Sequence, residues 1–412
     1  MIKLVNISVN NFKNIMNTDI EIKNFNVIVG PNNSGKSNFI LIIPFLDYII
    51  NGSLDSVQKS MENGFFPSGF GVIANRISKN KLEIDISLQY FDTISKNLFK
   101  YQIKISYEVD KEYHLSHKYK IFYENLEYKN IHNTGKNINI FSREKSDINF
   151  GKDISKKNIK SIPDYASVFR FLSLIIESQE ITKGYKDAIN GMKHILNAPI
   201  FYFSNIELKK TDDEKRIKSF GSRTIAVDIE YDIFKLKESK DKWKIFAETI
   251  NNLLDITKIY ADSFPIGKKE NKIKYFVYLT HLGSGKLLDE LSDGSLLLIS
   301  LVTEVFMSKS DIIFIEEPEN SIHPKALKDL ILFLRSYDTE KQFILTTHSS
   351  SLLNMIKPKD VLIARLSKNG NSKLGRVNNI KELNKRLRKG YINFGDTLIY
   401  NIDEEDEESK TY

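Results

Sequence analysis

Hydrophobic and polar residues alternate along much of the first 128 residues, a pattern that predicts β-strands. Within residues 1–29 the alternation is sufficient for two strands. The apolar positions are Ile2, Leu4 and Ile7 in the first strand, and Ile20, Ile22, Phe25 and Val27 in or near the second. Residues 82–128 hold three more alternating runs, which predict an antiparallel meander.

The middle of the chain changes from a polar stretch to helical spacing. Residues 129–160 are dominated by Asn, Lys, Ser, Asp and Gly, which predicts a long surface loop or a disordered stretch. Apolar residues then recur at helical spacing from Asp164 to His194 and again from Trp243 to Ile256. One face of each predicted helix carries Phe169, Leu172, Ile175 and Ile176, or Phe246, Ile250, Leu253 and Leu254.

From Ile273 the pattern returns to a strand, and from Leu291 onward helices alternate with buried strands. Phe39 to Ile50 is also apolar, but Pro44 and Asp47 interrupt it, which favours a helix of a soluble domain. These patterns predict an α/β unit whose two halves, near residues 1–60 and 275–412, are separated by a long insertion.

Composition limits the class of protein. A chain of 412 residues exceeds the size at which one core keeps growing, so two or more subdomains are expected. No apolar run reaches the roughly 20 residues that span a bilayer, and no signal peptide is visible in the first residues. The absence of cysteine excludes disulfides and thiolate metal sites. A cytoplasmic location is the simplest expectation.

The formal net charge of +7 allows a nucleic-acid partner, because neutralising phosphates supplies affinity. It does not require one. The abundance of Lys, Asn and Ile is equally consistent with an AT-rich genome.

A complete phosphate-binding loop follows the apolar run at residues 25–29. The G-x-x-x-x-G-K-[ST] motif consists of Gly30, Pro31, Asn32, Asn33, Ser34, Gly35, Lys36 and Ser37. The glycines let successive backbone N–H groups turn toward phosphate oxygens. Lys36 supplies positive charge for the β and γ phosphates, and the Ser37 hydroxyl is placed to ligate Mg²⁺. The sequence therefore predicts that the chain binds ATP or GTP.

Three further segments carry groups that suit nucleotide hydrolysis. The buried strand at residues 311–317 ends in two carboxylates. Glu316 is expected to hold Mg²⁺ through water, and Glu317 is expected to polarise the attacking water. Another buried strand ends at His348, which could hydrogen-bond the γ-phosphate. Leu291–Ser295 precedes a helix that Ser292 can cap, and the Gly294 N–H can approach an anion.

In this order the four segments resemble the phosphate loop, signature, Walker B strand and switch histidine of ABC-type ATPases. Asp293 and Ser295 depart from the Leu-Ser-Gly-Gly-Gln signature, and Glu316-Glu317 replaces the usual Asp-Glu. These departures resemble the RecF/SMC/OLD-like branch of the family. Three other segments support that resemblance, namely Asn11–Ile15, Glu-Glu-Pro-Glu-Asn-Ser-Ile-His-Pro at residues 316–324, and Thr-Thr-His-Ser. Many relatives in this branch are prokaryotic anti-phage ATPases.

The resemblance implies a P-loop NTPase fold, namely an ABC-type head with an antiparallel β subdomain and an inserted helical region. The head would comprise residues 1–60 and 273–412, the latter with an acidic tail at Asp403–Glu408. Residues 61–128 would form the β subdomain, and residues 129–272 a loop plus a helical insertion. Residues 319–324 would form the D-loop at a dimer interface.

The resemblance also implies a Mg²⁺-dependent ATPase that forms a head-to-tail homodimer or a higher oligomer. Each ATP would lie between the phosphate loop of one copy and Ser292 and Gly294 of the other. The 64 residues after His348 lack the Glu…Asp-x-Asp pattern of OLD-type nuclease domains. We therefore expect an ATPase that responds to a nucleic-acid or phage trigger and controls a separate effector, such as a nuclease.

Two alternatives remain open at this point. The first is a RecF-like ATPase of DNA repair or loading. The second is the ATPase subunit of a membrane transporter, which the Asn-Phe-Lys start and the Glu-Glu-Pro-Glu run argue against.

Overall fold

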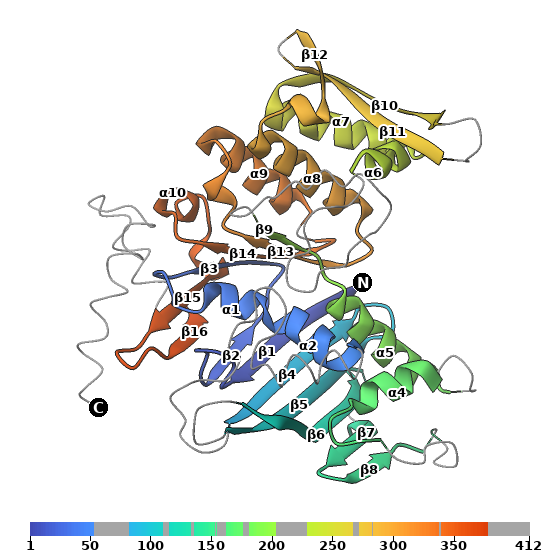
Figure 1. The fold of residues 1–412 in the computed structure, drawn as a ribbon, viewed down its shortest axis with the longest axis vertical. Helices are drawn as coiled ribbons and strands as arrows, with labels where there is room; N and C mark the ends of the chain where they lie inside the picture. Colours follow the sequence, from blue (N-terminus) through green and yellow to red (C-terminus); the bar gives the residue numbers. More distant parts are fainter. Residues whose placement is uncertain are drawn as a thin grey trace.

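Three sheets and their helices make up the described part of the chain (Figure 1). The computed structural model describes residues 1–52, 82–109, 115–132, 136–152, 154, 162–175, 181–202, 229–266, 272–281, 283–337 and 339–377. Ile176, the predicted acidic tail and residues 61–81 of the predicted β subdomain lie outside these ranges.

The largest sheet has seven strands in the order β2-β1-β4-β5-β6-β7-β8, and every neighbouring pair is antiparallel. Its strands are β1 (Ile2–Asn10), β2 (Thr18–Glu21), β4 (Leu82–Asp92), β5 (Asn97–Val109), β6 (Leu115–Asn130), β7 (Ile138–Glu144) and β8 (Asp147–Phe150). The predicted meander at residues 82–128 is confirmed by β4, β5 and β6.

The second sheet has six strands in the order β16-β15-β3-β14-β13-β9, all parallel except β16. They are β3 (Phe25–Val29), β9 (Ile200–Tyr202), β13 (Ile312–Glu316), β14 (Gln342–Thr347), β15 (Val361–Leu366) and β16 (Ser372–Arg376). Ile312 and Phe314 lie in one hydrophobic core and Ile313 and Ile315 in the other. Both faces of this sheet are therefore covered, which explains the continuous apolar runs.

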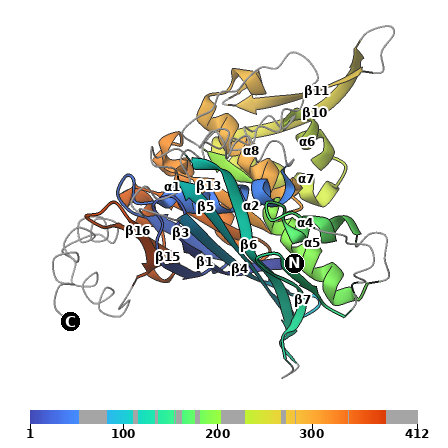
Figure 2. The same cartoon turned by 60° about the horizontal axis from the view of Figure 1, so that its bottom comes forward.

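Helices fill the space on either side of the parallel sheet (Figures 1 and 2). One core holds α1 (Lys36–Ile40), α2 (Ile42–Asn51), α4 (Val168–Ile175) and α5 (Lys183–Leu196) together with the antiparallel sheet. The other core holds α6 (Ile229–Leu236), α7 (Lys240–Leu254), α8 (Asp293–Met307), α9 (Pro324–Ser336) and α10 (Ser350–Leu353). The apolar segment at residues 39–50 is helical, as predicted. Pro44 has no backbone N–H to donate to the Ile40 carbonyl, and the break between α1 and α2 lies at this point.

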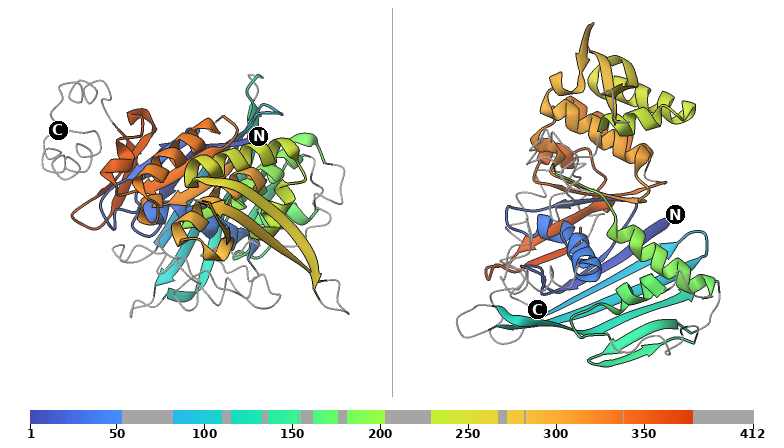
Figure 3. Two further views of the ribbon diagram at one scale, coloured as in Figure 1. Left: turned by 90° about the horizontal axis from the view of Figure 1, so that it is seen from above. Right: turned by 45° about the vertical axis from the view of Figure 1, so that its right-hand side comes forward.

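A three-stranded antiparallel sheet packs against α6 and α7 (Figure 3). It consists of β10 (Ile256–Ile266), β11 (Lys272–His281) and β12 (Ser284–Leu287). The helix predicted at residues 243–256 is confirmed as α7, with Phe246, Ile250 and Leu253 buried. None of the helices that the structure describes has the length and apolar character needed to cross a bilayer.

Two predictions about local structure were wrong. Residues 18–29 form two strands in different sheets, because the Asn26 side chain bonds both N and O of Lys23 and closes a turn between β2 and β3. Residues 138–150, expected as part of a loop, form the β7–β8 hairpin, in which Ile140 and Phe141 are fully buried. The polar composition around this short apolar segment concealed it.

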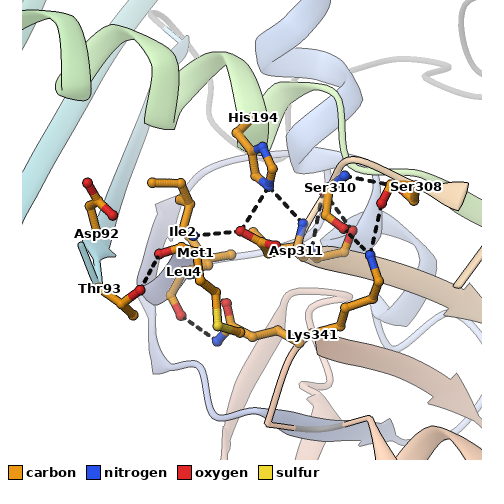
Figure 4. A network of polar contacts seen from close by, with 12 residues as sticks. Met1, Ile2, Leu4, Asp92, Thr93, His194, Ser308, Ser310, Asp311 and Lys341 are labelled. Carbon is orange, nitrogen blue, oxygen red and sulfur yellow. Dashed lines mark hydrogen bonds and ion pairs between the residues drawn. The ribbon is translucent and has the colours of Figure 1, made fainter. Parts of the chain in front are cut away.

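A polar network joins the antiparallel sheet to the parallel sheet at the beginning of β13 (Figure 4). The Asp311 carboxylate accepts from Ile2 N at 2.6 Å and lies 3.2 Å from His194 Nε2. Burial acts to raise the Asp311 pKa, but the neighbouring His194 imidazole and the hydrogen bond from Ile2 N hold it below its ordinary value. Lys341 Nζ donates to the backbone carbonyls of Ser308 and Ser310. These bonds fix β13, β1 and α5 to one another, so the strands that carry the candidate site have a rigid base.

Candidate nucleotide-binding site

Three neighbouring parallel strands end at the same edge of the six-stranded sheet. Val29 of β3 is paired with Thr347 of β14, and Thr346 is paired with Glu316 of β13. The segments that follow β3, β13 and β14 are the phosphate loop, Glu317 and His348. Because carboxyl ends of parallel strands collect functional groups, this edge is the candidate site.

The phosphate loop is packed so tightly that its glycines admit no side chain. A Cβ on Gly30 would lie 2.4 Å from the Ala364 carbonyl oxygen and 2.5 Å from Ser34 Oγ. Gly35 has a φ of 88°, and its Cβ would lie 2.8 Å from Ser372 Oγ. Asn33 also adopts a positive φ, of 65°. Alternation of such backbone angles turns N–H groups toward one concave side, the geometry that binds anions.

Two residues that sequence reasoning missed hold the loop from outside. Asn14 Nδ2 donates to the Asn33 carbonyl at 2.8 Å, and its Oδ1 accepts from Asn38 at 2.7 Å. The Ser372 hydroxyl donates to the Ser34 carbonyl, and Ser372 N donates to the Asn14 carbonyl at 2.6 Å. Asn14 lies in the Asn11–Ile15 segment that supported the family resemblance. No local signal in the sequence points to Ser372, because its role depends on the pairing of β15 with β3 and β16.

Lys36 and Glu316 are buried opposite charges. Lys36 Nζ donates to the carbonyls of Gly30 and Pro31 at 2.8 and 2.9 Å. Burial lowers the Lys36 pKa, while the charges of Glu317, Glu319 and Glu316 oppose that shift. Burial likewise raises the Glu316 pKa, and a hydrogen bond with Ser37 opposes the shift.

The residues present fit a Mg²⁺-nucleotide. Lys36 lies against a cradle that side chains cannot enter, where a phosphate would restore favourable surroundings for its positive charge. Glu316 and Ser37 are in hydrogen-bond contact and offer the oxygen ligands that Mg²⁺ prefers. The buried Ser34 hydroxyl has no partner among the described residues, a further polar group that a ligand could satisfy.

Glu317 has an unusual backbone that aims its side chain toward the switch segment. Its φ and ψ of 46° and 58° lie in the left-handed region, which a non-glycine residue occupies at a cost. Its N–H donates to the Thr346 carbonyl at 3.1 Å, which holds this conformation. Glu317 Oε1 lies 3.4 Å from His348 Nδ1, and Oε2 accepts from Asn320 at 2.9 Å. The structure therefore brings together the acid and the histidine that the sequence predicted.

Ser292 and Gly294 lie at the beginning of α8. Ser292 is the N-cap of α8, as predicted, and its hydroxyl accepts from Ser295 N at 3.4 Å. A Cβ on Gly294 would lie 2.1 Å from the Ser321 carbonyl oxygen, so Gly294 permits close packing of α8 against the predicted D-loop. Among the described residues, no hydrogen bond or ion pair joins Ser292 or Gly294 to the loop at residues 30–37.

The sequence itself decides the family. Residues 25–354 match the family described as "AAA domain, putative AbiEii toxin, Type IV TA system". The chain belongs to this family. The match includes the phosphate loop, the Glu316-Glu317 pair and His348, and excludes β1 and β15. As an AAA-domain protein with a complete phosphate loop, the chain is a P-loop ATPase.

One curated relative is Endonuclease GajA from Bacillus cereus (strain VD045), which is 25% identical over 364 residues. That match covers 85% of this chain and 56% of GajA, so the chain spans little more than half the length of the relative.

Solved structures similar to the chain include an SMC head domain from Thermotoga maritima, with 13% identity and a TM-score of 0.40. An Smc head domain derived from Pyrococcus furiosus has 13% identity and a TM-score of 0.49. These matches cover 91% and 94% of this chain and 99% of each structure. The strand order and the family match, rather than these likenesses, identify the fold as a P-loop NTPase of mixed α/β class.

Proposed function

We propose that the chain is a Mg²⁺-dependent ATPase that works as a head-to-tail homodimer or higher assembly. The observation that carries this proposal is the separation of two sets of groups. The phosphate loop, Glu316, Glu317 and His348 share one sheet edge, whereas Ser292 and Gly294 make no polar contact with the loop of their own chain. A second copy could supply the signature residues to each site.

The geometry of the site supports the following roles for its residues. Lys36 and the loop N–H groups bind phosphates, and Ser37 and Glu316 hold the metal ion. Glu317 accepts a proton from the attacking water, and His348, 3.4 Å away, senses the γ-phosphate. Mg²⁺-ATP, when bound, supplies the phosphoanhydride bond and neutralises developing negative charge. Hydrolysis then releases the signature segment of the opposing copy.

The biological role that we propose is anti-phage defence in the cytoplasm. The resemblance to anti-phage ATPases and the similarity to a protein named as an endonuclease support this role. The dimer would sense or clamp a nucleic-acid or phage trigger and control a separate effector, such as a nuclease. The alternative is a RecF-like repair or loading ATPase, supported by the net positive charge and by the same branch resemblance.

Capture of partners by a Glu317→Gln variant tests this role. That variant should hold ATP without turnover, so an affinity pull-down from phage-infected cells should retain an effector protein that Lys36→Ala loses. Full anti-phage protection by this chain with no partner gene present would contradict the separate effector. ATP-dependent binding to gapped DNA, with no effector requirement, would favour the RecF-like alternative.

The packing of Gly294 gives a first prediction. Gly294→Ala should reduce ATP hydrolysis and ATP-dependent dimerisation. Nucleotide binding by the monomer should stay unchanged. The added Cβ must push the Ser321 carbonyl away from its 2.1 Å position, at a cost of about 1–3 kcal/mol. Fluorescent-nucleotide titration and sedimentation velocity measure the two effects. Gly375→Ala, where nothing lies within 4 Å of the new Cβ, is the matched control.

An equal loss in both glycine variants, or a loss of nucleotide binding in Gly294→Ala alone, would show that Gly294 does not act at a shared interface.

A further inference from the structure

Glu319 is a third acidic residue at the candidate site. It begins the predicted D-loop, and the phosphate-loop, Walker B and switch motifs give its carboxylate no role within its own chain. It lies in the 3₁₀-helix η4 (Pro318–Asn320), directly after Glu317, and its side chain is 9% exposed. Its Oε1 accepts from Thr347 Oγ1 at 2.5 Å and from His348 N at 2.9 Å. One carboxylate oxygen therefore ties the end of the Walker B segment to the end of β14.

The contacts continue along the switch segment. Thr347 Oγ1 donates to Glu319 and accepts from Ser349 N at 3.0 Å. Ser349 in turn caps α10 by accepting from Leu352 N at 3.3 Å. Glu319 thus holds the His348 backbone directly and the Ser349 backbone through the Thr347 hydroxyl. The His348 Nδ1 lies 3.4 Å from Glu317 and 3.6 Å from Glu319.

The other carboxylate oxygen is unusual. Oε2 of Glu319 is buried and has no hydrogen-bond partner among the described residues. Leaving a buried acceptor unpaired costs about 1–3 kcal/mol, and more for a charged group. A glutamine or a smaller side chain would avoid part of that cost, so stability alone does not explain a carboxylate here.

We propose that Glu319 is a positioning residue for ATP hydrolysis. It acts through Thr347 and the His348 backbone, and it fixes the His348 imidazole opposite Glu317. The role rests on the proposed ATPase function, because it matters for turnover only if Glu317 and His348 act there. By joining the segments after β13 and β14, Glu319 makes the acid and the histidine one unit instead of two independent loops.

Two substitutions separate positioning from charge. Glu319→Gln keeps an oxygen that can accept from Thr347 and His348, whereas Glu319→Ala removes both bonds. We expect Glu319→Ala to lower kcat by about tenfold or more, because this is the effect of losing one hydrogen bond to a charged group. The KM and the Kd for ATP should stay within about twofold, because the two hydrogen bonds that Glu319→Ala removes go to the switch segment and not to the phosphate loop. Glu319→Gln should restore most of kcat. Glu144→Ala, at an exposed position of β7, is the control and should match wild type.

Hydrogen exchange provides a readout that does not depend on turnover. In nucleotide-free protein, the His348 amide should exchange faster in Glu319→Ala than in wild type, and at the wild-type rate in Glu319→Gln. Should Glu319→Ala unfold, Thr347→Val removes the hydroxyl donor alone and should lower kcat in the same way. The double variant Thr347→Val/Glu319→Gln should be no slower than Thr347→Val, because the Gln oxygen still accepts from the His348 amide.

A Glu319→Gln variant as slow as Glu319→Ala would overturn the proposal, because charge rather than the acceptor bonds would then matter. Unchanged kcat and unchanged His348 exchange in Glu319→Ala would also overturn it. Failure of the proposed function is distinguishable, since wild type itself would then bind ATP without hydrolysing it.

Discussion

Replacing Glu317 with Gln should leave ATP binding intact and slow ATP hydrolysis by about 10²- to 10⁴-fold, the range that a general base contributes. Gln keeps the volume and can still accept from Asn320, the 2.9 Å partner of Glu317 Oε2. It cannot take a proton from water. Phosphate release and fluorescent-nucleotide titration measure the two quantities. Glu144→Gln, at an exposed position, should behave as wild type.

The Glu317→Gln variant should also remain dimeric in the presence of ATP, because release depends on turnover. Hydrolysis at the wild-type rate in this variant would show that another group takes the proton. Of the described residues at this edge, Glu319 would then be the next candidate, since its Oε2 has no partner among them.

Replacing Lys36 with Ala should weaken ATP binding by on the order of 100-fold, because one hydrogen bond to a charged group contributes about 1.5–3 kcal/mol. The structure suggests a second reason. Lys36 Nζ now bonds the carbonyls of Gly30 and Pro31, so the substitution also removes contacts that shape the loop. Isothermal titration with a non-hydrolysable ATP analogue measures the affinity.

Lys152→Ala, on the exposed surface beyond β8, is the matched control for the lost positive charge. Retention of wild-type ATP affinity by Lys36→Ala would contradict the assignment of residues 30–37 as the phosphate site. Lys36→Arg keeps the charge but carries a larger planar head, which the carbonyl pair does not suit, so it should restore binding only in part.

Much of the parallel sheet was predictable because its strands carry their own signal. The apolar runs that end at Val29, Glu316 and Thr347 are buried on both faces, and each leads into a segment with recognisable chemistry. The phosphate loop is equally local, since two glycines and a lysine at fixed spacing specify its shape.

Other features depend on contacts between distant segments and leave little trace in the sequence. The left-handed backbone of Glu317 is fixed by Thr346, and Asn14 and Ser372 meet the phosphate loop only after two sheets have formed. The hairpin at residues 138–150 was missed for a related reason. Its short apolar segment is buried in the core that also holds residues of α4 and α5, and the polar residues around it resemble a loop.

The structure gives a second reason for a glycine at position 294, in addition to the one that the sequence motif predicted. The sequence predicted an N–H that approaches an anion. The structure adds that only glycine allows α8 to pack against the Ser321 carbonyl. That packing places the signature segment against the predicted D-loop, on the side of the head that the proposed dimer would bury.

Mixing two inactive variants tests the shared site most directly. Lys36→Ala disables the phosphate loop, and Ser292→Arg blocks the signature, so neither variant should hydrolyse ATP alone. In a mixed head-to-tail dimer, the Ser292→Arg copy supplies an intact loop and the Lys36→Ala copy an intact signature. Random pairing in an equal mixture should therefore restore about a quarter of the wild-type sites. Recovered ATPase activity of that order is the predicted result, and no recovery on mixing, with both variants folded, would contradict a site shared between two copies.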